Sequence, residues 1–231
     1  MSTGLVGLAG IGLLLGFRHA FEPDHLAAVS TLATRQGRLL EACRLGVAWA
    51  LGHTASVGLV VATIIVGGVR LPARLWPAAD FLVALLLIGL GGSVIARYAR
   101  GRWHLHVHSH DGGPHLHLHS HAHGAAHDHA HPAGDVRRSL GFGLLHGLAG
   151  SAAILVLLVA AAPTRAAQLA YFAAFACGTL LGMLCVSLSL AAIVRLAAER
   201  GRHWAMTLHV GAAAASVAVG LALAGRVAAG F

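Results

Sequence analysis

The sequence predicts an all-α membrane protein with six transmembrane helices. Apolar residues make up 57% of the 231-residue chain and charged residues only 10%, whereas about a quarter of the residues in a soluble domain are charged. The apolar residues form segments of about 20 residues or more, the length of helix that crosses a bilayer. Apolar and polar residues do not alternate within these segments, so the strands of a membrane barrel are not predicted.

The six predicted helices occupy residues 4–33, 42–68, 79–98, 139–162, 168–195 and 204–228. Glycine, alanine and leucine dominate these segments, so we expect close packing with small residues at the helix contacts. The helices divide the chain into a first three-helix half at 1–98, a connection at 99–138 and a second three-helix half at 139–231.

The two halves share short stretches of sequence. "GF" at 16–17 recurs at 141–142, and "AWALG" at 48–52 aligns with "AFACG" at 174–178. Because each half has an odd number of helices, two copies would face opposite ways across the membrane. The sequence therefore suggests a 3+3 inverted repeat, against the alternative that helices rich in alanine and glycine align by chance.

The distribution of arginine predicts the orientation. The connections after the first, third and fifth helices hold eleven arginines: Arg35, Arg38, Arg44, Arg97, Arg100, Arg102, Arg137, Arg138, Arg195, Arg200 and Arg202. The opposite side holds four: Arg70, Arg74, Arg165 and Arg226. Because cytoplasmic loops are enriched in basic residues, we expect a multi-pass protein of the inner or plasma membrane, with both termini outside and the 99–138 connection in the cytoplasm.

The stretch "HAFEPDH" (19–25) places four ionisable residues in the first predicted helix: His19, Glu22, Asp24 and His25. Such residues are costly within a membrane and usually mark a functional site. Pro23 has no N–H to donate, so we expect a break that leaves the carbonyl of His19 unpaired and brings the side chains together. Imidazole with carboxylate suits Ni(II), Co(II) or Zn(II) better than Mg(II) or Ca(II).

A simpler interpretation of the same stretch stays open. The segment would be a helix end that reaches the lipid headgroups, with Arg18 and Glu22 paired one turn apart and the histidines as caps.

Two further histidines lie in apolar helices. His53 in "LGHTASVG" has Thr54 beside it, and His146 in "LLHGLAGSAA" lies near Ser151 and is flanked by glycines that permit close backbone approach. Each histidine is a candidate metal ligand or a partner that orients one. The alternative for both is a hydrogen bond between neighbouring helices.

The connection contains a tract rich in histidine at 104–131. Its low complexity, with glycine, proline and alanine, predicts a disordered loop that binds transition metals with many interchangeable ligands and so buffers or delivers them. The loop histidines are His104, His106, His108, His110, His115, His117, His119, His121, His123, His127, His129 and His131.

These motifs resemble those of the nickel/cobalt transporter family. His19, four residues and then Asp24-His25, on the helix ahead of "LGHTASV", resembles the His-x4-Asp-His signature of that family. "HGLAGSAA" and the histidine-rich loop are similar to the six-span branch, which contains urease-accessory membrane proteins and nickel/cobalt efflux proteins. The resemblance implies that His19, Asp24 and His25 select the metal and that His53 belongs to its path. In eight-span members the signature lies on the second helix, whereas here it lies on the first.

Residues and resemblance together predict a permease for Ni(II), with Co(II) as a further candidate substrate. The predicted metal ligands are His19, Asp24, His25, His53 and His146, supported by Glu22, Pro23, Thr54 and Ser151. Import is favoured, because an interior-negative potential drives a dication inward. Efflux of the same ions, transport of zinc or another divalent ion, and a membrane metallochaperone for nickel enzymes are the alternatives.

Motifs of other protein classes are missing from the sequence. There is no HExxH and no GxxxxGK[ST], so we expect neither an enzyme nor a chain that binds ATP itself. We expect no permanently bound cofactor, since the metal is the transported substrate. The expected partners are a transition-metal ion and the lipid bilayer, with nickel-enzyme accessory proteins or a second copy of the chain as candidates, and no nucleic acid.

Overall fold

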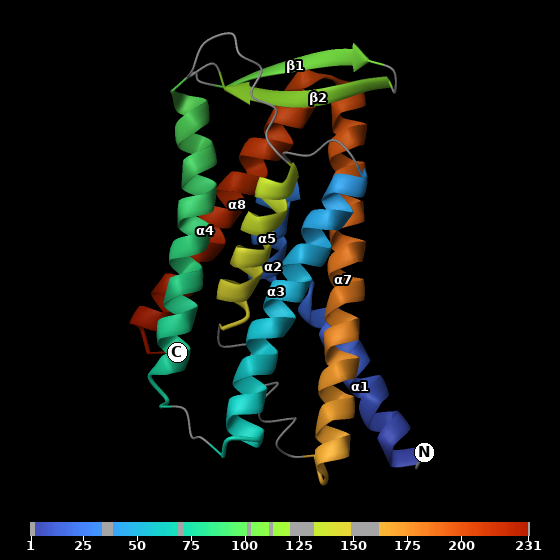
Figure 1. Ribbon diagram of the computed structural model, residues 1–231. Coiled ribbons are helices and arrows are strands. Elements are labelled where there is room, and N and C mark those ends of the chain that lie inside the picture. Colours follow the sequence, from blue (N-terminus) through green and yellow to red (C-terminus); the bar gives the residue numbers. More distant parts are fainter. Residues whose placement is uncertain are drawn as a thin grey trace.

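The computed structural model describes residues 3–33, 39–68, 72–100, 103–110, 113–120, 132–148 and 162–230. These residues contain seven helices and one β-hairpin (Figure 1). In chain order the elements are α1 (Thr3–His19), α2 (Pro23–Ala33), α3 (Leu39–Ile65), α4 (Leu75–Ala99), β1 (Trp103–His110), β2 (Gly113–Ser120), α5 (Pro132–His146), α7 (Arg165–Arg200) and α8 (Arg202–Ala228).

Four of these helices are long and apolar enough to cross a membrane: α3, α4, α7 and α8. They coincide with four of the six predicted segments. The predicted segment 4–33 is a pair of shorter helices, α1 and α2, interrupted at residues 20–22. The predicted segment 139–162 begins within α5, and its residues 149–161 lie outside the described part of the chain. The chain is a multi-pass membrane protein.

The outside of the bundle is apolar and part of its inside is polar, the reverse of a soluble domain. Large exposed side chains such as Leu14, Leu59 and Leu169 are about two-thirds exposed. The buried polar residues are His19, His25, Thr31, His53, Ser56, Ser139, His146, Thr179, Ser187 and Ser216. Because lipid tails are as apolar as leucine, polar groups in a membrane bundle turn inward and bond to neighbouring helices.

Small residues bring the helices into backbone contact. α1 packs against α7, α3 against α5, and α4 against α8. A Cβ atom at Gly16 of α1 would collide with the backbone of Phe175 in α7, and one at Gly143 of α5 would collide with the carbonyl of Trp49 in α3. These glycines therefore fix how closely α1 and α5 approach their partner helices.

The hairpin lies at one end of the bundle, and both ends of the described chain lie toward the other end (Figure 1). α1 runs inward from the end that holds the N-terminus, and α5 runs inward from the end that holds the hairpin. Both helices end near the middle of the bundle, whereas α3 and α7 continue along its length.

Part of the histidine-rich tract differs from the disordered loop that the sequence predicts. Residues 103–110 and 113–120 form the antiparallel strands β1 and β2. The register sets His104 opposite His119, His106 opposite His117 and His108 opposite His115. The reason is the strict alternation in "HLHVH" and "HLHLH", whose period of two matches a strand. His121, His123, His127, His129 and His131 lie outside the described residues.

Candidate metal site

The site begins at the interruption between α1 and α2. The backbone N–H groups of Phe21 and Glu22 donate to the carbonyls of Arg18 and His19, each at 3.0 Å. α2 then starts at Pro23, a first helical position at which the missing N–H is not needed. The break predicted at this proline is present. The prediction that the His19 carbonyl stays unpaired is wrong, because a tight turn at the helix end supplies Glu22 as its donor.

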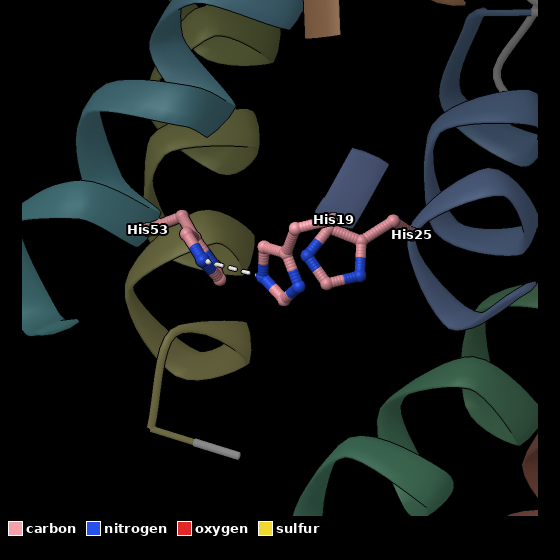
Figure 2. A group of neighbouring side chains, drawn as sticks. All are labelled: His19, His25 and His53. Atoms are coloured by element: carbon pink, nitrogen blue, oxygen red, sulfur yellow. Dashed lines mark hydrogen bonds between the residues drawn. The ribbon is translucent and has the colours of Figure 1, made fainter. Parts of the chain in front are cut away.

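Three buried imidazoles converge beside this break, from His19 at the end of α1, His25 in α2 and His53 in α3 (Figure 2). Nε2 of His19 lies 3.2 Å from Nε2 of His53. The ring of His25 lies 4.4 Å from that of His19 and 5.2 Å from that of His53, measured between centroids. Each residue offers a nitrogen within 4.8 Å of the others, so the three can share one metal ion.

A second group forms on the other side of His25. One carboxylate oxygen of Asp24 accepts the backbone N–H of His25 and lies 3.0 Å from Nδ1 of its ring. The other oxygen lies 3.0 Å from Nε2 of His146 at the end of α5. Asp24, His25 and His146 again offer ligand atoms within 4.8 Å of one another.

For imidazoles in the neutral form that binds metals, the hydrogen bonds leave one tautomer for each ring. A carboxylate only accepts, so Nδ1–H of His25 and Nε2–H of His146 donate to Asp24, and Nδ1–H of His19 donates to Glu22 at 3.1 Å. Nε2 of His19 then accepts from Nε2–H of His53. His25, His53 and His146 each keep one nitrogen lone pair for a metal. The lone pair of His19 accepts from His53, so His19 would have to exchange that hydrogen bond for a bond to the metal.

The three free lone pairs lie on buried atoms without a hydrogen-bond partner among the described residues: Nε2 of His25, Nδ1 of His53 and Nδ1 of His146. Unpaired buried polar atoms are rare in folded proteins and call for an explanation. Coordination of a cation would satisfy a nitrogen of this kind.

Trp49 completes the site, and the sequence reasoning missed it. Its fully buried ring stacks on His53 at 5.0 Å with an angle of 9° and meets His25 and His146 edge-on at 4.8 and 5.2 Å. The signal in the sequence is its spacing, since residues four apart on a helix lie on the same face. Trp49 precedes His53 by four residues.

The remaining predicted site residues lie around this cluster or outside the described chain. Thr54 is half-buried on α3, one residue after His53. Ser151 lies outside the described residues. Glu22 pairs with His19. This pairing differs from the alternative interpretation, in which Glu22 pairs with Arg18 and the histidines cap a helix end at the headgroups.

The donor set of the cluster is four imidazoles and one carboxylate. Imidazole suits nickel, cobalt, zinc and copper, whereas Mg(II) and Ca(II) prefer sites built from oxygen. All four rings are buried, and Asp24 is 21% exposed. The cluster can therefore hold a borderline dication away from lipid and from most water.

No family model matches the chain, and no solved structure matches it. The chain is 32% identical over 186 residues to the urease accessory protein UreH of Bacillus sp. (strain TB-90), an alignment that covers 78% of this chain and 74% of the relative. The protein belongs to the family of the urease accessory protein UreH.

Proposed function

We propose that the protein carries Ni(II), with Co(II) as a further candidate ion, across the membrane through the cluster of His19, Asp24, His25, His53 and His146. One observation carries the proposal: four imidazoles and one carboxylate converge inside a membrane bundle, and three of the imidazoles have a buried nitrogen without a hydrogen-bond partner among the described residues. The kinship with a urease accessory protein supports nickel as the ion, because urease is a nickel enzyme and the signature resembles that of nickel/cobalt transporters.

The chemistry of the proposed step is ligand exchange. The ion loses hydration water as nitrogen lone pairs replace it, and the carboxylate of Asp24 offsets one of its two charges. Trp49 excludes water from the three rings that it contacts. The protein then acts as a permease without enzyme activity and without a resident cofactor, and the ion is its substrate.

Import is the favoured direction. An interior-negative potential stabilises an entering dication by about 4.6 kcal/mol per 100 mV, twice the value for a single charge. Export works against that field and requires coupling to another ion. With the arginine-rich hairpin end in the cytoplasm, the ion would enter from the end that holds the N-terminus and leave on the hairpin side. There the histidine-rich tract would collect it.

Cellular nickel content tests both transport and direction. Cells that express the protein should contain more nickel than cells without it, and His25→Asn should abolish the difference. His203→Asn, an exposed histidine of α8 outside the cluster, is the matched control and should behave as the parent. Lowered nickel content would establish efflux instead. Equal nickel content with and without the protein, at verified expression, would refute transport of nickel. Loss of nickel accumulation in the presence of excess Zn(II) would identify a zinc transporter.

A second candidate function is delivery of nickel to an apoenzyme at the membrane. The name of the relative, an accessory protein, and the cross-strand pairing of histidines in the hairpin favour it. Deletion of 104–131 should leave most of the ion flux of a permease. Loss of urease activation with unchanged flux would favour delivery.

A further inference from the structure

We infer that the transported ion occupies two overlapping positions that share His25. The first is formed by His19, His25 and His53, and the second by Asp24, His25 and His146. The inference rests on the proposed transport function and assigns to His146, a residue of α5, the role of ligand in the second position.

The distances place His25 between the two groups. Its ring centroid lies 4.4 Å from that of His19 and 4.4 Å from that of His146. The rings of His53 and His146 are 6.2 Å apart. The His25 ring turns Nδ1 toward Asp24, so an ion can exchange His19 and His53 for Asp24 and His146 while it stays beside the same ring.

The two positions offer different ligands. The first has three imidazoles and the second has two imidazoles and a carboxylate. Nδ1 of His53 and Nδ1 of His146 are both buried without a partner among the described residues, so each group brings one unsatisfied nitrogen of its own.

The fold presents His19 and His146 in the same way. "GFRH" (16–19) ends α1 and "GLLH" (143–146) ends α5, so each histidine terminates its helix three residues after a glycine. Each glycine packs on a partner helix through backbone contact, Gly16 on α7 and Gly143 on α3. His19 and His146 therefore occupy equivalent places at the ends of their helices.

These two helices reach the cluster from opposite ends of the bundle (Figure 1). α1 has 17 residues and α5 has 15, which gives lengths of about 26 and 23 Å, short of the roughly 30 Å of a bilayer core. Helix C-termini carry partial negative charge, and half-helices of this kind hold cations in transporters. Each position thus lies at the end of a half-helix that starts on its own side of the membrane.

Binding and flux, measured on the same variants, test the inference. The parent is the full-length chain with Trp76→Phe, Trp103→Phe and Trp204→Phe, so that only Trp49 reports on the cluster. Quenching of its fluorescence by added Ni(II) measures binding, and uptake of Ni(II) into proteoliposomes with an interior-negative potential measures flux. The variants are His25→Asn, His53→Asn and His146→Asn, with His203→Asn as the control.

We expect His53→Asn and His146→Asn each to bind Ni(II) within about tenfold of the parent affinity, because one position survives in each, and to lose at least tenfold in flux. His25→Asn should lose both binding and flux, and His203→Asn neither. Parent flux in His146→Asn would overturn the second position. If His53→Asn or His146→Asn lost binding as completely as His25→Asn, the cluster would be a single site, and this result would also overturn the inference.

Two checks keep these outcomes separate. A monodisperse gel-filtration peak establishes that each variant folds, and His146→Gln replaces His146→Asn if the latter aggregates. Absence of Ni(II) flux in the parent would refute the proposed function alone. In that case the binding series still decides between one position and two.

Discussion

Gly143→Ala tests whether the contact between α3 and α5 positions the cluster. An added Cβ would lie on the carbonyl oxygen of Trp49, well inside the 3.0 Å that real Cβ atoms keep from other heavy atoms. Backbone forms the obstacle, so no flexible side chain can move aside. We expect α5 to shift away from α3 and to carry His146 with it.

The size of the effect follows from the contacts of His146. Overpacking of this kind costs about 1–3 kcal/mol, and each 1.4 kcal/mol is about tenfold in an equilibrium constant. An outward shift of about 1 Å breaks the 3.0 Å hydrogen bond between Nε2 of His146 and Asp24, because such bonds are lost beyond about 3.5 Å. Misplacement on this scale costs up to about a hundredfold in a positioned site. We expect flux to fall by about ten- to a hundredfold.

The assay is Ni(II) uptake into proteoliposomes, with the melting temperature measured in parallel. Gly141→Ala is the matched control on the same helix, because its added Cβ meets no described atom within 4 Å. It should keep the parent flux. Parent flux in a well-folded Gly143→Ala would refute the positioning role of this contact. An equal loss in both variants would assign the effect to alanine in α5 and not to packing against α3.

Three more substitutions probe the cluster. Asp24→Asn removes the carboxylate charge that accepts hydrogen bonds from His25 and His146. Because hydrogen bonds to charged groups contribute about 1.5–3 kcal/mol, we expect the affinity for Ni(II), measured by isothermal titration, to fall at least tenfold. Glu199→Gln, at the exposed end of α7, should bind as the parent. Trp49→Leu should lower both flux and melting temperature more than Trp49→Phe, which keeps an aromatic ring against His53. Equal flux and equal melting temperature in these two variants would contradict a role for the aromatic ring. Pro23→Ala supplies the missing N–H and favours a continuous helix, so flux should fall more than the melting temperature does, and parent flux in a well-expressed variant would contradict this.

The sequence alone was sufficient to predict the convergence of His19, Asp24 and His25. Ionisable residues in an apolar segment cannot stay dispersed in lipid, and the proline among them marks where the helix breaks. Both arguments depend on residues within one short stretch. His53 was a candidate for the same reason, as a polar residue in an apolar helix.

Other features of the site depend on contacts between distant segments. His146 meets Asp24 across 122 positions of the chain, and no spacing within a single sequence specifies such a pair. The role of Gly143 cannot be read from the sequence either, because many glycines line these helices. Only its packing against Trp49 distinguishes Gly143 from Gly141. The composition of the tract predicts disorder, whereas the alternation of histidine with leucine or valine favours the pairing of β1 with β2.

The charge of the cluster bears on how an ion can leave it. A dication held beside Asp24 retains a net charge of one, because the other ligands are neutral imidazoles. Glu22 lies further out, bonded to Nδ1 of His19 and 37% exposed, so water screens it from the ion. A second carboxylate at the centre would neutralise the ion and hold it in a medium where charge attraction is strong. Transport requires binding that is firm enough to replace hydration and weak enough, or divided over enough positions, to permit release. In the proposed transport, imidazoles arranged on both sides of a single carboxylate would meet both requirements.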